Sequence, residues 1–199
     1  MSDYVNIIEH WGEDGERGAH QPLEVVRLDA SETAMIPFST DGEAVSLHYC
    51  EYKEIGGYVH CNGPGCVLCR CGRKAEERLL LAVYLPATGG IAVLPISPNS
   101  RAGALRPQLI PILRSGRRVA LLISKPDRVK FTVSTIDLVN DMDDGAAVIK
   151  PFLAERQAGG AKLASVFPQL DNRTLADIPG VASMLKLKGI TVHDDAHRQ

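Results

Sequence analysis

Residues 48–71 read HYCEYKEIGGYVHCNGPGCVLCRC, and this stretch decides how the rest of the chain is interpreted. It spaces one histidine and three cysteines as His-x12-Cys-x4-Cys-x2-Cys, at His48, Cys61, Cys66 and Cys69. The last two cysteines follow a Gly-Pro-Gly turn, as in a zinc knuckle, and imidazole and thiolate groups are ligands that Zn²⁺ prefers. The sequence therefore predicts one structural zinc ion held by these four side chains.

A hairpin is predicted to carry the first two ligands. Two segments with alternating polarity, 45–53 and 58–61, flank the turn-forming pair Gly56-Gly57. If that turn is tight, residue 52 faces residue 61 across the ribbon. Residues two apart on a strand share a face, so the hairpin decides which ligands can meet.

The fourth ligand is predicted from the faces of this hairpin. His48, Cys50 and Cys61 share one side, whereas His60 is adjacent to Cys61 and points to the other side. His48 is therefore the predicted ligand, with Cys71 as the first alternative and Cys50 as the second. Four protein ligands leave no open position for water, so the predicted site is structural and not hydrolytic. A redox Cys-x2-Cys dithiol would require a βαβ context, which the sequence lacks.

Composition favours one main folded domain over a disulfide framework or a membrane protein. Four of the five cysteines fall within residues 61–71, and residues 1–18 are acidic and lack the apolar run of a signal peptide. No stretch approaches the roughly 18 apolar residues of a membrane span, which predicts a soluble intracellular protein without a membrane partner. The 199 residues are enough for one domain of about 150 residues with appendages.

Charge is distributed unevenly along the chain, although the net charge is only −2. Residues 1–60 carry 3 basic and 12 acidic side chains, residues 61–130 carry 12 basic and 3 acidic, and residues 131–199 carry 7 basic and 9 acidic. A basic middle segment between acidic segments predicts one surface that attracts polyanions. The alternative is that these segments neutralise one another across the fold.

The remaining pattern predicts a mainly β, α+β protein. Strand-like segments pair around turns, 79–85 with 91–95 and 117–124 with 129–136, and 100–114 has helical spacing. Several short antiparallel strands with a helix between the third and the fourth are typical of an OB-like small barrel. The zinc ribbon would be an insertion in that barrel.

The predicted organisation has three parts. Residues 1–22 form a flexible acidic arm, and residues 23–140 form the OB-like core with a zinc subdomain at about 45–75. Residues 141–199 form a C-terminal helical segment and a polar tail. The sequence leaves open whether these helices pack on the barrel or serve as a docking module.

Cations and tyrosines gather beside the predicted zinc site. Aromatic rings next to cations on an OB-like sheet suit single-stranded nucleic acid, because each base can stack and each phosphate can meet a cation. The candidate stacking residues are Tyr49, Tyr52 and Tyr58. Phosphates are expected in a cleft between the zinc loop, which follows Cys61, and the third predicted hairpin, formed by 117–124 and 129–136. The residues expected to contact them are Arg70, Arg73, Lys74, Arg117, Arg118, Arg128 and Lys130.

Together these features resemble the zinc-containing single-stranded DNA-binding proteins of tailed phages, which are helix-destabilising proteins of replication and recombination. The resemblance covers roughly residues 40–138. It rests on the His-Cys₃ array beside tyrosines and cations, followed by RPQLIPILRSG at 106–116 and RRVALLISKPDRVKFTVSTID at 117–137. It implies an OB-fold core, a structural zinc, DNA held in a basic aromatic cleft, and the cytoplasm of a bacterial or phage-infected cell.

The chain departs from that family at both ends. Its first residues are acidic where the family has a basic arm, and the acidic tail is reduced to Asp194 and Asp195. The predicted function is sequence-tolerant binding of single-stranded DNA, without catalysis, in replication, recombination or a mobile-element process. The C-terminal segment would recruit replication or mobile-element proteins. Two alternatives stay open, a zinc-dependent protein-interaction subunit that docks an acidic partner and an RNA-binding accessory protein.

Overall fold

The structure is a computed structural model that describes residues 23–39, 41–127, 129–138 and 143–191. Three sequence expectations lie outside these residues. They are the acidic arm at 1–22, the phosphate contact of Arg128, and the polar tail with Asp194 and Asp195.

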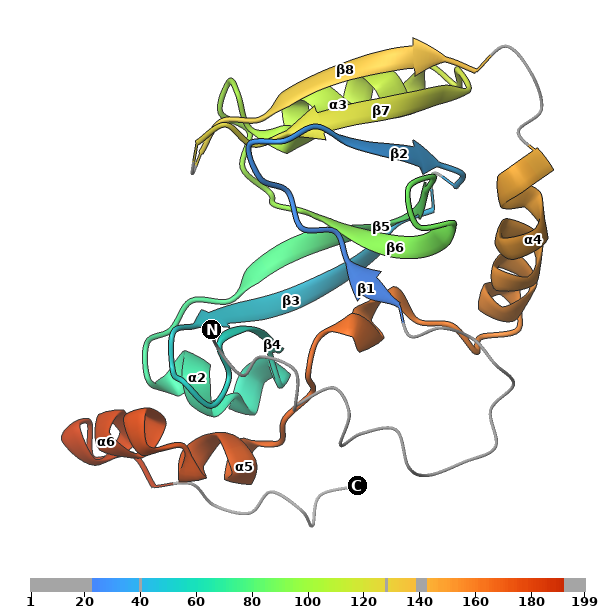
Figure 1. Cartoon of the computed structure of the whole chain (residues 1–199). Helices are drawn as coiled ribbons and strands as arrows, with labels where there is room; N and C mark the ends of the chain where they lie inside the picture. The colour runs from blue at the N-terminus through green and yellow to red at the C-terminus, as the bar shows by residue number, and fades with distance from the viewer. Residues whose placement is uncertain (1–22, 40, 128, 139–142, 192–199) are drawn as a thin grey trace.

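A branched sheet of eight strands organises the described residues (Figure 1). The long strand β5 is its centre, because β6 pairs along one edge while β3 and β2 share the other edge. The strands are β1 Glu24–Val25, β2 Thr33–Pro37, β3 Glu43–Cys50, β4 Gly57–His60, β5 Glu76–Leu85, β6 Gly90–Ile96, β7 Val119–Ser124 and β8 Thr132–Asp137.

The path of paired strands is open. It runs β1-β6-β5-β2-β7-β8, with β3 and β4 branching from β5. A closed barrel would need another pair that joins the two ends of the path. The mixed α+β class is therefore confirmed, whereas the OB-like barrel is not.

The main core lies between the two layers of this sheet. In Figure 1, β2, β7 and β8 form one layer above β5 and β6. Strand β7 alternates buried and half-buried residues, so Leu121 and Ile123 point inward, as strand periodicity requires. Helix α3, Leu105–Arg114, adds Leu105 and Leu109, which are one helical turn apart.

Helix α3 begins later than the sequence predicts. The expected helix starts at residue 100, but α3 starts at Leu105. Gly103 adopts φ +87, a left-handed conformation that an α-helix cannot include. The helix therefore forms only after this residue.

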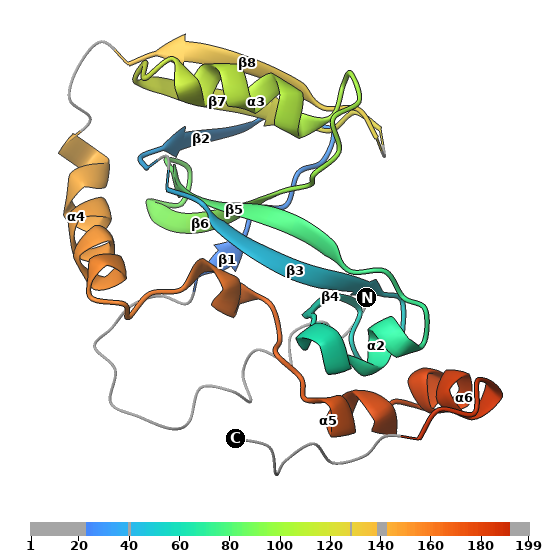
Figure 2. The same ribbon diagram turned by 180° about the vertical axis from the view of Figure 1, so that it is seen from behind.

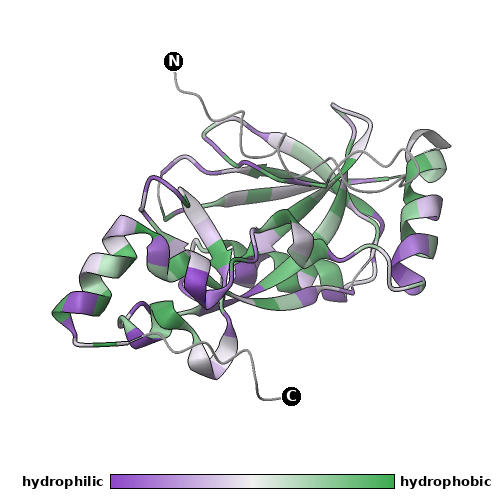
Figure 3. Cartoon of the chain, turned by 90° about the horizontal axis from the view of Figure 1, so that it is seen from below, coloured by the Kyte–Doolittle hydropathy of each residue, from purple (hydrophilic) through white to green (hydrophobic). Residues whose placement is uncertain are grey.

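Strand β5 is buried on both faces, which explains its continuous apolar run LLLAVYL. Leu81 and Val83 face the main core, whereas Leu80 and Ala82 face a second core. That second core is covered by Phe152, which lies on helix α4, Asp143–Gln157. Figure 3 shows mainly hydrophobic colouring on the central strands and mixed colouring on the outer helices.

The C-terminal segment packs on two separate parts of the protein. Helix α4 lies beside the sheet, and helices α5, Asn172–Asp177, and α6, Pro179–Leu187, lie below the zinc knuckle (Figures 1 and 2). The described part of the segment therefore packs on the folded chain. Within the described residues, no helix is both long enough and apolar enough to cross a membrane.

Candidate metal centre

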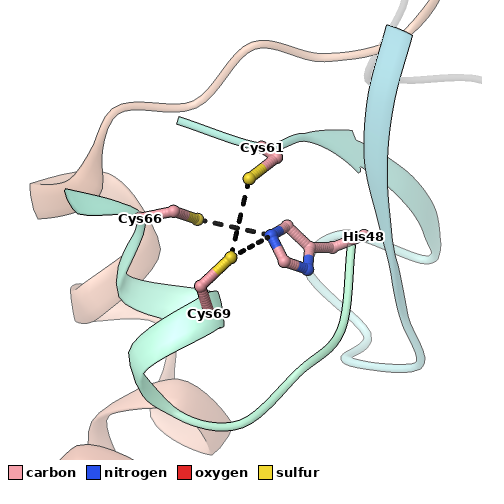
Figure 4. A group of neighbouring side chains, drawn as sticks. All are labelled: His48, Cys61, Cys66 and Cys69. Atoms are coloured by element: carbon pink, nitrogen blue, oxygen red, sulfur yellow. Dashed lines mark hydrogen bonds between the residues drawn. The ribbon is translucent and has the colours of Figure 1, made fainter. Parts of the chain in front are cut away.

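Four neighbouring elements bring the four predicted ligands together (Figure 4). His48 lies near the end of β3, and Cys61 directly follows β4. A 3₁₀ turn then leads to Cys66, and the four-residue helix α2, Val67–Arg70, presents Cys69. The four side chains form a cluster that could hold one metal ion.

The geometry of the cluster fits a tetrahedral ion. The ligand atoms all lie within 4.8 Å of one another. His48 Nε2 is 3.4 Å from Cys66 Sγ and 3.5 Å from Cys69 Sγ, and Cys61 Sγ is 3.6 Å from Cys69 Sγ. A tetrahedron with ordinary zinc bond lengths would separate N from S by about 3.6 Å and S from S by about 3.8 Å. The donor set and its spacing are thus consistent with zinc.

The register of the β3–β4 hairpin differs from the sequence prediction. His48 pairs with Val59 and Cys50 with Gly57, while the Cys61 N–H donates to the Ser46 carbonyl. Cys61 is therefore opposite residue 46, and the expected pairing with residue 52 is wrong because the turn is longer. The two registers differ by an even number of residues, so Cys61 keeps the same face as His48.

The other candidate ligands lie outside the cluster. His60 is on the opposite face of the ribbon, where its Nε2 is 2.9 Å from the Ala164 carbonyl. Cys50 and Cys71 are buried in the neighbouring apolar core. Within the described residues, the ligand group contains His48 and neither of these alternatives.

Burial sets the protonation of the ligands. It lowers the pKa of His48, and the Lys74 backbone raises that pKa by a smaller amount, so the imidazole is neutral as a metal ligand must be. Burial, followed by the neighbouring thiols of Cys61 and Cys66, raises the pKa of Cys69 to about 12. A cation must therefore displace the thiol protons when it binds.

The two ring nitrogens of His48 have different surroundings. Nε2 faces the thiols of Cys66 and Cys69. Nδ1 is buried and has no hydrogen-bond partner among the described residues. Nε2 is therefore the ring nitrogen that could bind the ion.

Asn172 fastens the knuckle to the C-terminal segment. Its Oδ1 accepts from the Val67 N–H at 3.0 Å and from Asn62 Nδ2 at 3.1 Å. Its Nδ2 donates to the Gly65 carbonyl at 3.1 Å. Val67 begins α2, so Asn172 also satisfies a backbone N–H that the helix itself leaves free.

We expect Asn172→Ala to lower the free energy of unfolding by about 1 to 3 kcal/mol, because the buried Val67 N–H loses its partner. Chemical denaturation and the rate of metal loss to a chelator would measure the effect. Asn99→Ala is the matched control, since the Asn99 side chain accepts only from the nearby Arg101 N–H among the described contacts. Equal stability of the two variants would contradict this role of Asn172.

The C-terminal helices complete the core of the zinc module, which we define as residues 46–73 and 168–191. Leu175, Val181 and Leu185 pack with the knuckle residues Val67 and Leu68. None of these five side chains is more than 6% exposed. The ribbon that carries the predicted ligands is therefore half of a two-part unit and not a free insertion.

The predicted stacking tyrosines do not share one surface. Tyr49 pairs across the hairpin with Tyr58, on the face opposite His48, and Tyr58 contacts Phe167 of the second core. Tyr49 is 54% exposed, whereas Tyr58 is half-buried with the Arg78 guanidinium 4.1 Å from its ring centre.

Tyr52 lies against helix α6 instead. A Cβ on Gly180 would come within 2.3 Å of its ring, so ring and helix are in direct contact. The Arg73 guanidinium is 5.4 Å from the ring centre and donates to the Tyr52 hydroxyl at 3.4 Å. Tyr52 therefore has a packing role in the zinc module.

The predicted cations fall into two groups. Arg70, Arg73 and Lys74 lie on the zinc loop, and Lys130 lies near the tip of the β7–β8 hairpin. In both Figures 1 and 2 this tip and the zinc module lie toward the same lateral edge, the tip at the upper end of the molecule and the zinc module at the lower end.

Arg117 and Arg118 precede β7 and lie at its other end, about 20 Å away at the usual strand rise. They line a cavity of about 550 Å³ beside α4, and Arg117 is paired with Asp137 at 2.6 Å. The expected single cleft therefore does not include these two arginines.

Sequence reasoning missed two residues of the module. One is Asn172, and the other is Lys188, whose Nζ would lie 2.9 Å from a Cβ on Gly72. Burial raises the pKa of Cys71, while the charges of Lys188, Arg70 and Arg73 lower it, so all three cations lie near this thiol. The basic LKLKG stretch at 185–189 was a signal that could have been read.

No protein-family model, curated protein or solved structure matches the chain.

Proposed function

We propose that the cluster binds one structural zinc ion and that the protein binds single-stranded nucleic acid, DNA in preference to RNA, without catalysis. The observation that carries the proposal is the loop beyond the knuckle. It holds Arg70, Arg73 and Lys74, and none of these forms an ion pair with a carboxylate in the described part of the chain. Cations that have no carboxylate partner can each bind a phosphate.

The zinc ion would have a structural role. His48, Cys61, Cys66 and Cys69 fill its four positions, so no site remains for a reacting water. Its binding would hold the loop in one shape, which places the cations before the nucleic acid arrives.

The phosphate path would run from the zinc loop toward the tip of the third hairpin. Lys130 is exposed there, and Lys125 lies 5.5 Å from the ring centre of Phe131. Tyr49 is the exposed ring on the β3–β4 ribbon, on the face away from the metal. Binding would therefore depend more on phosphate contacts than on a continuous row of stacked bases.

The sheet would be an OB-like barrel that stays open. Strand β2 pairs with both β5 and β7, so it joins the β5–β6 hairpin to the β7–β8 hairpin. Strand β3 pairs with the same edge of β5 as β2 does. Helix α3 lies between these hairpins in sequence. Partly open barrels of this type commonly bind oligonucleotides.

The direct test is a fluorescence-anisotropy titration with labelled single-stranded and double-stranded DNA of the same sequence. We expect tighter binding of the single strand and an affinity that falls steeply with salt. An RNA strand of the same sequence measures the preference for DNA. If duplex DNA binds as tightly, or if neither binds, the zinc-dependent protein-interaction function becomes the better explanation.

A further inference from the structure

We propose that Arg70, Arg73 and Lys188 form a phosphate-binding site that joins the zinc loop to the end of helix α6. This inference rests on the proposed function and extends it, because it assigns the C-terminal helices to the nucleic-acid surface. The ligand would be a backbone phosphate of a single strand.

Lys188 lies close to the zinc loop. It ends helix α6, and its Nζ lies 2.9 Å from the position that a Cβ on Gly72 would occupy. Gly72 has φ +85, which other residues rarely adopt. The backbone at this position therefore favours glycine, and the exposed glycine leaves room for the Lys188 ammonium beside the loop.

Arg70 contacts the same C-terminal segment from the loop. Its guanidinium donates to the Thr191 carbonyl at 3.1 Å, three residues beyond Lys188. Arg73 directly follows Gly72 in the loop. Three cations from two distant segments thus converge on one short turn of the loop.

The charges near this turn are not balanced by the metal centre. A divalent ion with three thiolates and a neutral histidine carries one net negative charge. Glu51 adds a second negative charge near Arg73. The three cations Arg70, Arg73 and Lys188 exceed these two negative charges by one.

A phosphate group suits this arrangement. Its oxygens can accept from the fork of an arginine and from the ammonium of a lysine together. Its charge would also relieve the repulsion between cations that lie side by side. A site of this kind recognises a backbone without reading its sequence.

The experiment compares Lys188→Gln with Lys150→Gln in the full, zinc-loaded chain. Lys150 is an exposed lysine on α4, far from the zinc loop in sequence, and serves as the matched control. The measurement is the affinity for labelled oligothymidylate between 50 and 200 mM salt, with metal content determined for each variant.

We expect Lys188→Gln to make the slope of log affinity against log salt shallower by about 0.7, which reduces the loss of affinity over this range by about 2.6-fold. Lys150→Gln should keep the slope of the unmodified protein. A normal slope in Lys188→Gln, with a shallower slope in an Arg73/Lys74 variant, would overturn the site and leave the proposed function intact.

A second measurement separates the site from the proposed function. Pyrophosphate should shift the amide resonance of Gly72 in the unmodified protein and should shift it less in Lys188→Gln. If oligothymidylate does not bind but this shift is present, the anion site stands and the proposed function fails. If the shift is absent too, both proposals fail.

Discussion

His48→Ala is expected to abolish stable zinc binding and to unfold the zinc module, whereas the unmodified protein should contain about one zinc per chain. The reason is that His48 Nε2 lies 3.4 and 3.5 Å from two of the thiols, so its loss opens the tetrahedron. Metal binding in small modules contributes on the order of 10 kcal/mol of folding free energy. Elemental analysis and amide hydrogen exchange would measure the two effects.

The exchange pattern is the sharper readout. Amides of α5 and α6 should lose protection together with those of the knuckle, because both halves share one core. Amides of β5 and β6 should stay protected, since the main core contains none of the metal ligands.

Two variants control for the loss of any neighbouring polar group. His60→Ala should keep its zinc, because His60 faces the Ala164 carbonyl. Cys71→Ser should also keep it, because Cys71 lies outside the ligand group. Full zinc occupancy in His48→Ala, together with loss in Cys71→Ser, would move the fourth ligand to Cys71.

The double change Arg73→Gln with Lys74→Gln is expected to make the salt dependence of single-strand binding clearly shallower. Each phosphate contact contributes about −0.7 to the slope of log affinity against log salt, so the slope should change by roughly 1 to 1.5. Glutamine keeps much of the side-chain length, so the packing of residue 73 on Tyr52 is largely preserved. Anisotropy titrations at several salt concentrations give the slope.

A second pair of adjacent arginines provides the control. Arg117→Gln with Arg118→Gln removes the same charge at the far end of β7, beside α4. This pair should leave the slope unchanged. If both pairs flatten the slope equally, binding follows the total charge of the protein and no local path exists.

The ligand cluster could be predicted from the sequence because alternate residues of a strand lie on the same face, whatever the exact pairing. The predicted register of the β3–β4 hairpin was wrong. His48 and Cys61 still share a face, because the predicted and observed registers differ by an even number of residues. The spacing of Cys66 and Cys69 is a local property of the knuckle. Predictions from local spacing of this kind remain correct even when the pairing of strands is predicted wrongly.

Other features depend on contacts between distant segments. Asn172 contacts Val67 and Gly65, which are more than 100 residues away in the sequence. A single asparagine has no sequence pattern from which this role could be predicted. The packing of Tyr52 on Gly180 is equally invisible in the sequence. The separation of Arg117 from Lys130, in contrast, follows from the length of β7 and could have been derived.

The pairing of the knuckle with α5 and α6 has a consequence for how the chain folds. During synthesis, residues 48–69 leave the ribosome long before residues 172–187 exist. Val67 and Leu68 would then face water until the last helices arrive. We therefore expect the knuckle, with its predicted ion, to fold first and the later helices to fold onto it, so that a fragment ending near residue 140 would lack half of that unit.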